Sequence, residues 1–285
     1  MWKPEILVLG PGGIKGFLEL GALYVLESED FLTDVHTFVG VSVGAIVSLL
    51  MVCGRTITEI IAEAADADIF QDLSSVNIKD STEKLGLVSS DPIRRKLVRS
   101  VLEKFGYIPT LQQLFNSTGL TLVCVTVNLD KEEPEYMSHE NEPDIPCVDA
   151  VMYSMNIPII FYKLKYKGCV YVDGALGNPY PINQYDDGFT KILGIYIEST
   201  RKTTREPGNS TATMYFHKIV QFTMGQLRTM ILENCSDMCK HIRLQSNIID
   251  TTGLTIDADL KADMILEGYT YGAEFLETVR LEETA

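Results

Sequence analysis

The chain opens with an alternation of strand-like and helix-like segments. Residues 6–9 and 38–41 are short apolar runs that indicate strands, and residues 15–27 and 43–53 repeat apolar side chains at helical spacing. Strand, helix, strand, helix in this order predicts a parallel sheet covered by helices, because parallel neighbours need a crossover connection between them. This alternation places the chain in the α/β class of folds.

The remainder of the chain extends this pattern. Further strands are predicted at 120–129, 134–139 (paired with 120–129), 169–174, 191–199 and 242–249, and further helices at 91–106, 146–155, 212–233 and 258–279. Thr56 and Glu59 form a capping box for another helix. Residues 66–90 are predicted to be irregular, and residues 200–213 a surface loop.

These elements predict one domain over residues 1–285, with a mainly parallel central sheet flanked by helices. Its motif-bearing part is residues 5–200, and we expect the C-terminal extension, residues 212–285, to pack on that part.

Charge and cysteine content limit the function classes. The net charge is −15, from 39 acidic and 24 basic residues, which argues against nucleic acid as a partner because phosphate binding needs a basic face. Six scattered cysteines without a Cys-x-x-Cys pair indicate free thiols, and they offer no convincing metal site. The uncharged stretch Val39–Gly54 is shorter than the roughly 20 residues of a membrane span. We therefore expect a soluble, cytoplasmic protein.

A serine between two glycines follows the second strand. Gly40-Val41-Ser42-Val43-Gly44 fits G-x-S-x-G, the pattern of a nucleophile on a strained strand-to-helix turn. Gly40 and Gly44 leave room where strand and helix approach closely. Ser42 is the candidate nucleophile.

A serine nucleophile needs donors for the oxyanion that forms during attack. The stretch "GPGGIKG" follows the first strand and opens a helix, so the backbone amides of Gly12, Gly13 and Ile14 are candidate donors. A dinucleotide-binding loop is excluded because Lys15 stands where its last glycine belongs. A P-loop is excluded because Gly-Lys-Ser/Thr is absent.

The base has two candidates. Asp173 ends an apolar strand, and Gly174 permits a tight turn that exposes the carboxylate at the C-terminal edge of the sheet, where active sites of parallel sheets lie. A histidine downstream of Ser42, either His217 or His241, would instead make an α/β-hydrolase. A third hypothesis is a non-catalytic module that binds a lipid or a nucleotide.

Three elements stand in chain order: Gly-Gly-x-Lys-Gly after the first strand, G-x-S-x-G after the second, and Asp-Gly-Ala far downstream. This order resembles the patatin-like phospholipases. The similarity extends to residues 150–161, with Ser154, Pro158 and Phe161 on the family pattern, and to "VDGALGNPYPI" at 172–182.

The resemblance implies a three-layer fold and a Ser-Asp dyad that needs no histidine, metal or cofactor. Ser42 becomes the nucleophile and Asp173 its base, and the oxyanion loop falls on Gly12, Gly13 and Ile14. The supporting positions are Lys15, which stands at the family's Arg/Lys position, Gly16, Gly40, Gly44, Gly174 and Ala175. One departure is Pro11, which has no N–H where the family usually has glycine.

The implied activity is hydrolysis of acyl esters in a phospholipid or other acyl lipid, through an acyl-serine intermediate. The implied substrate lies in a membrane or micelle, so we expect transient association with its surface, and whether a protein activates the enzyme is left open. Because the chain is acidic, apolar contact should dominate this association. Residues 67–90 are our candidate for a lipid-contacting cap, and the alternative is that their apolar side chains fill a satellite core under a loop. These side chains are Ile69, Phe70, Leu73, Val76, Ile78, Leu85, Leu87 and Val88.

Overall fold

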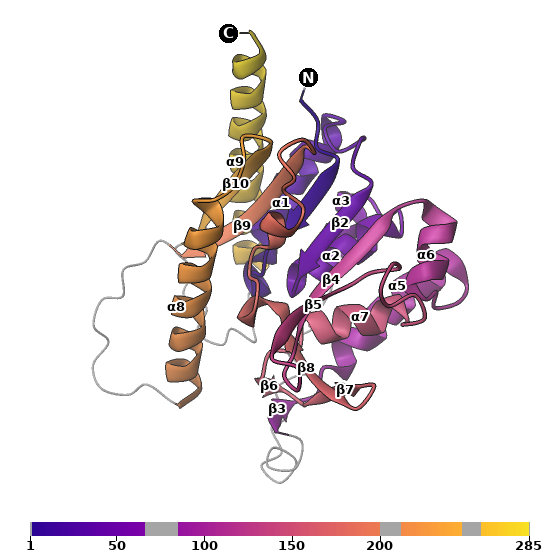
Figure 1. The fold of residues 1–285 in the computed structure, drawn as a ribbon. Helices are drawn as coiled ribbons and strands as arrows, with labels where there is room; N and C mark the ends of the chain where they lie inside the picture. Colours follow the sequence, from indigo (N-terminus) through magenta and orange to yellow (C-terminus); the bar gives the residue numbers. More distant parts are fainter. Residues whose placement is uncertain (1, 66–84, 200–211, 247–257, 285) are drawn as a thin grey trace.

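The structure, a computed structural model, describes residues 2–65, 85–199, 212–246 and 258–284. A central sheet lies between helices (Figure 1). The strands are β1 (Ile6–Leu9), β2 (Thr37–Val41), β3 (Gly86–Val88), β4 (Thr121–Asn128), β5 (Glu133–Met137), β6 (Ile159–Phe161), β7 (Leu164–Tyr166), β8 (Cys169–Asp173), β9 (Ile192–Ser199) and β10 (Cys239–Ser246). The α-helices are α1 (Gly16–Ser28), α2 (Val43–Val52), α3 (Ile57–Ala65), α5 (Asp91–Phe105), α6 (Leu111–Thr118), α7 (Cys147–Ser154), α8 (Ala212–Leu232) and α9 (Ala258–Thr284). Short 3₁₀ segments are η1 (Gly13–Lys15), η2 (Gly174–Leu176) and η3 (Pro181–Gln184).

The central sheet is mainly parallel, as the sequence predicts. Its strands run in the order β10-β9-β1-β2-β4-β8-β7, and β5 pairs with β4 outside this path. The pairs from β10 to β4 are parallel, whereas β5 and β8 run antiparallel to β4, and β7 runs antiparallel to β8. β3 and β6 form a separate two-stranded sheet.

Alternate residues of the central strands enter two different hydrophobic cores, because successive side chains of a strand point to opposite faces. Leu7 and Leu9 of β1 belong to the core that contains α1, α2 and α9 residues. Ile6 and Val8 belong to the second core, which α8 completes with Met224. The sheet is therefore covered on both faces, which confirms the three-layer architecture.

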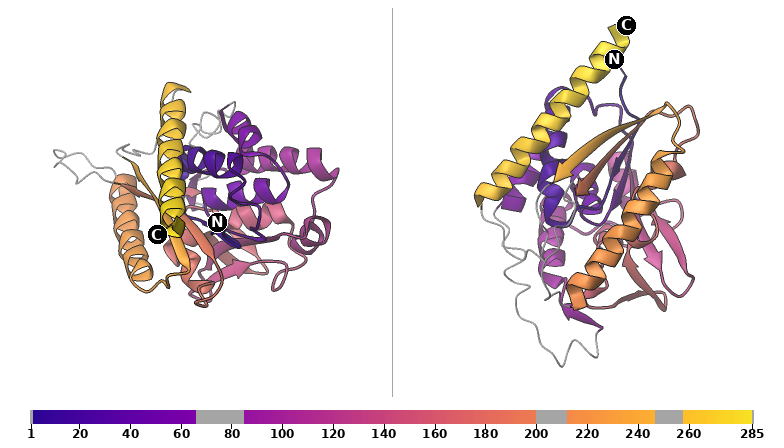
Figure 2. Two further views of the ribbon diagram at one scale, coloured as in Figure 1. Left: turned by 90° about the horizontal axis from the view of Figure 1, so that it is seen from above. Right: turned by 90° about the vertical axis from the view of Figure 1, so that its left-hand side faces the viewer.

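The C-terminal helix α9 packs along α1 with the two backbones in contact (Figure 2). A Cβ atom at Gly21 would lie 2.0 Å from the carbonyl oxygen of Ile265, and a Cβ atom at Gly268 would lie 2.0 Å from that of Leu18. No other residue fits at these crossing points, since real Cβ contacts do not fall below about 3 Å. These glycines allow α9 to cover α1.

Most of the predicted elements are confirmed, including the pairing of β5 with β4 and the capping box of Thr56 with Glu59. All six cysteines are free thiols. The prediction of irregular structure up to residue 90 is wrong for β3, which pairs with β6 from a distant part of the chain. Three-residue strands are too short to be recognised from periodicity, and their pairing is not local.

The helix α6 is absent from the sequence-based prediction, although a capping box marks its start. Thr110 accepts a hydrogen bond from the Gln113 N–H, and Gly119 ends the helix in the left-handed conformation. Most of the predicted lipid-contacting cap, including Ile69 and Phe70, lies outside the described residues. Of its described apolar side chains, Val88 is buried in the core and Leu87 packs against that core, whereas Leu85 is exposed. Among the helices that the structure describes, none combines the length and hydropathy needed to span a bilayer.

Candidate active site

The two candidate catalytic residues meet because β2 and β8 share one edge of β4. Val41, the last residue of β2, pairs with Val125, and Asp173, the last residue of β8, pairs with Thr126. β5 pairs with β4 beside both of these positions, so β2 and β8 occupy the opposite edge and meet end to end. Ser42 follows β2 directly, and it therefore lies next to Asp173.

Ser42 occupies a strained turn between β2 and α2. Its φ is +58° and its ψ is −122°, a backbone conformation that residues other than glycine rarely adopt. A Cβ atom at Gly40 would lie 2.3 Å from the Cα of Ala45, and one at Gly44 would lie 2.4 Å from the carbonyl oxygen of Leu9. Both flanking glycines are thus required by close backbone approach, as expected for a nucleophile turn.

Asp173 is buried at the opposite side of this junction. Its Oδ1 accepts a hydrogen bond from the Ala175 N–H at 2.9 Å. Burial raises the pKa of Asp173 to about 6, against the lowering effects of the Ser42 side chain and of the Ala175 N–H. Gly174 is again a steric requirement, because a Cβ atom there would lie 2.1 Å from the carbonyl oxygen of Val125.

The direction of β8 differs from the reasoning that singled out Asp173 in the sequence. We expected its carboxylate at an edge where parallel strands end, but β8 runs antiparallel to β4. Because β8 runs opposite to β2, the C-terminal residue of β8, Asp173, still meets the C-terminal end of β2.

The segment at the end of α7 holds both candidate residues. The Ser154 hydroxyl accepts a hydrogen bond from the Ser42 N–H at 3.1 Å. The Asn156 carbonyl accepts one from the Asp173 N–H at 2.9 Å, and its side chain donates to the Tyr171 carbonyl at 2.9 Å. Ser154 was found in the sequence only as part of a pattern, and its contact gives it a positioning role.

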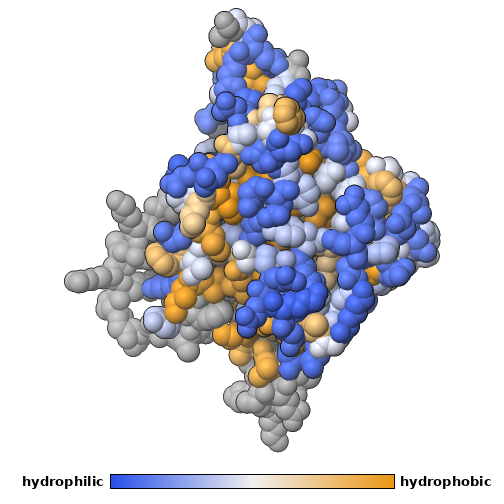
Figure 3. All heavy atoms as spheres, in the orientation of Figure 1, coloured by the Kyte–Doolittle hydropathy of each residue, from blue (hydrophilic) through white to orange (hydrophobic). Residues whose placement is uncertain are grey.

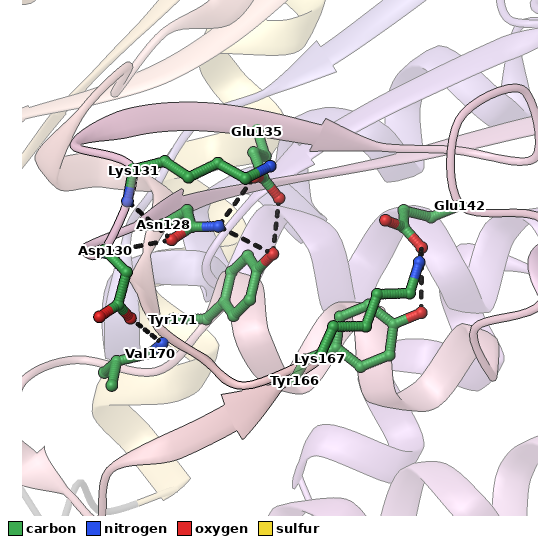
Figure 4. Close-up of polar contacts among 9 residues, drawn as sticks. All are labelled: Asn128, Asp130, Lys131, Glu135, Glu142, Tyr166, Lys167, Val170 and Tyr171. Carbon is green, nitrogen blue, oxygen red and sulfur yellow. Dashed lines mark hydrogen bonds and ion pairs between the residues drawn. The ribbon is translucent and has the colours of Figure 1, made fainter.

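A polar network on the hairpin of β4 and β5 anchors β8 (Figure 4). The Tyr171 hydroxyl donates to Glu135 at 2.8 Å, and the Asn128 side-chain amide donates to both of these groups. Lys131 adds a further hydrogen bond to Glu135 at 2.8 Å. Burial acts to raise the pKa of Glu135, but these hydrogen bonds outweigh it and keep the pKa below its ordinary value. An ionised Glu135 therefore fixes β8 two residues before Asp173.

The glycine-rich loop lies at the same site. Gly12 and Gly13 line a pocket with Ser42, and the φ of Gly13 is +54°. Lys15 also lines this pocket, and its N–H donates to the Gly12 carbonyl at 3.0 Å. The Ile14 side chain instead enters the core, and Ile14 is not among the residues that line the pocket. Gly16 has a steric role, because a Cβ atom there would lie 2.9 Å from a methyl group of the first residue of α2.

The pocket between these groups has a volume of about 120 Å³. Both Ser42 and Asp173 line it, together with Ala175 from the turn after β8. The sequence did not indicate its other wall, to which α8, β9, η2 and the segment before β6 contribute. The lining residues missed in this way are Ile157, Leu176, Ile197, Val220, Gln221, Met224 and Arg228. The spacing of apolar residues in 212–232 predicts a helix, but it does not tell which part of the protein that helix will cover.

No histidine with a described side chain lines the pocket. His241 contacts the Tyr180 hydroxyl at 2.8 Å, and His139 stacks on Phe115 with ring centroids 3.9 Å apart. His36 contacts the hydroxyl of its neighbour Thr37 at 3.0 Å. The side chain of His217 lies outside the described part.

One group of potential metal ligands occurs among the described residues, at Asp186, Cys235 and Cys239. Asp186 accepts hydrogen bonds from the Ser236 amide and hydroxyl, so its charge is compensated without a metal. The pKa of Cys239 is raised to about 12, first by burial and then by the charge of Asp186, which opposes the thiolate form that binds metals. None of these residues lines the pocket of Ser42.

Comparison with known proteins agrees with this geometry. The protein-family model described as "Patatin-like phospholipase" matches residues 7–185. A protein of Invertebrate iridescent virus 6 named "Probable lipid hydrolase" is 31% identical over 185 residues, which are 63% of this chain and 62% of that protein. An uncharacterized protein of Acanthamoeba polyphaga mimivirus is 29% identical over 271 residues, covering 90% of this chain and 87% of the relative.

Two solved structures share the fold at 16% identity. VipD from Legionella pneumophila aligns with a TM-score of 0.57 over 97% of this chain and 67% of its own. ExoU from Pseudomonas aeruginosa, in its heterodimeric complex with SpcU, aligns with a TM-score of 0.53 over 97% of this chain and 52% of its own. The chain thus spans about half the length of ExoU and less than two thirds of the iridescent virus protein.

The family match covers more than half of the chain, and the chain belongs to the patatin-like phospholipase family.

Proposed function

We propose that the protein cleaves acyl esters of phospholipids with a dyad of Ser42 and Asp173. The observation that carries the proposal is that Ser42 and Asp173 line one pocket, with the serine side chain near enough to lower the pKa of the buried carboxyl. The strained turn of Ser42 further supports it, because such strain is characteristic of catalytic sites. The glycine-rich loop supplies amides beside the same serine.

The reaction proceeds in two halves. Ser42 Oγ attacks the ester carbonyl carbon while the Asp173 carboxylate takes its proton, and the amides of Gly12, Gly13 and Ile14 stabilise the oxyanion. The carbon–oxygen bond to the leaving alcohol breaks, and Asp173 returns the proton to that oxygen. Water then attacks the acyl-serine, with Asp173 accepting its proton and passing it to Ser42 as the fatty acid leaves. This chemistry uses no metal or cofactor.

Two cationic side chains support a phospholipid as the substrate. Lys15 and Arg228 both line the pocket, although the chain as a whole has a net charge of −15. The Arg228 guanidinium donates to the Ile197 carbonyl at 3.1 Å and lies 5.0 Å from the ring centroid of Tyr196. These contacts and an ion pair with Glu198, 3.7 Å away, hold the Arg228 guanidinium at the pocket, where a phosphate would share its charge with that carboxylate.

A fluorophosphonate probe is expected to label Ser42, with a rate that falls about tenfold for each pH unit below the pKa of Asp173, near 6. Only the ionised carboxylate can accept the serine proton, so acid removes the base. Peptide mapping by mass spectrometry identifies the labelled serine, and gel fluorescence at pH 5 to 8 gives the rate.

The variant Asp173→Asn separates the hypotheses. Strongly reduced labelling at every pH supports the dyad. Full labelling of this variant would instead assign the base to a histidine, as in an α/β-hydrolase. A parent protein that does not react at all would favour a non-catalytic binding module.

Replacing Arg228 by glutamine is expected to raise KM for a monomeric short-chain phospholipid by at least about tenfold, because a charge-assisted hydrogen bond is lost. For an uncharged ester with the same acyl chain we expect KM to change less than about twofold. Arg228→Lys should retain most of the phospholipid affinity. Steady-state kinetics on both substrates measure this contrast.

Arg243→Gln is the matched control, since Arg243 also pairs with Glu198 but does not line the pocket. It should leave both KM values unchanged. An equal rise of KM on the charged and the uncharged substrate in Arg228→Gln would assign Arg228 to pocket structure rather than to phosphate recognition.

A further inference from the structure

Helix α8 has two apolar faces with different surroundings. Val220 and Met224 face the pocket of Ser42. On the other side, Tyr215, Ile219 and Phe222 recur at intervals of four and three residues, which places them in one stripe along the helix. Tyr215 is 64%, Ile219 46% and Phe222 68% exposed, and Met230 continues the stripe at 63%. Such large side chains in solvent are unusual unless the face contacts something.

The stripe lies in a segment without negative charge. Acidic residues are 39 of the 285 in the chain, so a 21-residue helix would carry about three on average, but α8 contains none. Its charged residues are Lys218 and Arg228, and Lys218 is exposed. On a strongly acidic molecule, this is a surface that can approach a layer of phosphate groups without repulsion.

A second apolar surface lies on the opposite side of the pocket. Ile157 and Pro158 line the pocket, and the next residue, Ile159 of β6, is 41% exposed with a φ of +71°. A β-branched residue in this conformation is strained. Leu85, beside β3, is 59% exposed.

The two surfaces lie at the same end of the molecule. The start of α8 and the small sheet of β3 and β6 lie together in Figures 1 and 2. In Figure 3, hydrophobic residues gather over α8 and again near β6. Exposed apolar side chains therefore lie on two elements, α8 and the segment before β6, that also contribute residues to the lining of the Ser42 pocket.

We propose that the stripe of α8, with Ile159 and Leu85, docks the protein on the surface of a phospholipid bilayer. This proposal rests on the proposed function, because it explains how an acyl chain passes from the bilayer to Ser42. Aromatic and aliphatic side chains of a helix lying in the interface supply the binding energy. A protein partner seated across both surfaces would cover the rim of the pocket, whereas a bilayer delivers the substrate there.

The double variant Ile219→Ser with Phe222→Ser tests the proposal. We measure vesicle binding by sedimentation with diether phosphatidylcholine, which cannot be hydrolysed. The partition coefficient of the double variant should be at least about tenfold lower than that of the parent protein. Hydrolysis of a soluble short-chain ester should stay within about twofold of the parent. Raising NaCl to 1 M should not weaken vesicle binding of the parent, because apolar contacts are not screened.

A matched control carries the same chemical change elsewhere. Leu281→Ser with Phe189→Ser removes two exposed side chains, 63% and 83%, from the end of α9 and from the loop before β9. This control should bind vesicles like the parent. Insertion can also be observed directly by tryptophan fluorescence. On vesicle binding, the emission of the Phe222→Trp variant should shift to shorter wavelength, whereas that of Phe189→Trp should not.

Unchanged vesicle partition in the Ile219/Phe222 variant, with ester hydrolysis intact, would overturn the docking proposal. A second outcome would also overturn it. If the parent protein is a dimer in gel filtration, the variant is a monomer and vesicle binding is the same for both, the stripe contacts a second copy of the chain. A parent that binds vesicles through the stripe but hydrolyses no ester would support docking and contradict the proposed catalysis.

Discussion

Replacing Ser42 by alanine is expected to lower turnover of a soluble ester by at least about a thousandfold, and Asp173→Asn is expected to do the same. Each change removes one half of the proposed proton-transfer pair, whose members line the same pocket. Because the two residues act as one unit, the double variant should be scarcely slower than either single variant. Initial-rate measurements with a chromogenic ester measure all three.

Ser48→Ala provides the control for this experiment. Ser48 is a fully buried serine of α2, the helix that follows Ser42, and its hydroxyl has no hydrogen-bond partner in the described part of the chain. Its removal should leave turnover unchanged. Turnover within tenfold of the parent in Ser42→Ala, with an intact circular dichroism spectrum, would show that another residue is the nucleophile.

The variant Asp173→Asn should also be more stable than the parent at pH 7, by up to about 3 kcal/mol. The folded-state pKa of Asp173 is raised from 3.8 to about 6, chiefly by burial. The folded protein therefore binds the proton more tightly than the unfolded chain, so this group lowers the stability as the pH rises from about 4 to 6. Asparagine fills the same space without the buried charge.

Urea unfolding at several pH values measures this effect. The stability gain of Asp173→Asn should be full above pH 6 and should disappear near pH 4, where the carboxyl group is neutral in both states. A loss of stability at pH 7 would mean that the interactions with Ser42 and Ala175 outweigh the cost of burying the charge. The expected combination, a more stable but inactive protein, is typical of a catalytic carboxylate.

The local parts of the site could be predicted from the sequence, because each depends on a short run of residues. Glycines at 40 and 44 flank the serine at positions where a Cβ atom would collide with backbone. The glycine-rich loop and the Asp-Gly turn are equally local. The fold class followed from the order of strands and helices in the same way.

The parts that could not be predicted depend on contacts between distant segments. β2 and β8 meet end to end because β2, β5 and β8 all pair with β4. The sequence of β8 does not reveal that this strand runs antiparallel to β4. The wall of the pocket on α8 was missed for the same reason. Its residues lie after position 212, outside the segments that carry the motifs.

The family match ends at residue 185, but two strands of the central sheet, β9 and β10, come later in the chain. β1 lies between β2 on one edge and β9 on the other, and all four of its residues are buried. A fragment that stopped at residue 185 would keep the pairing of β1 with β2 but leave the backbone donors and acceptors on the β9 edge of this apolar strand without partners. Open edges of this kind recruit strands from neighbouring molecules, which leads to aggregation. The piece of this chain that can stay monomeric therefore extends at least through β9, whose Ile195 carbonyl also receives the N–H of Gly10, just before the glycine-rich loop.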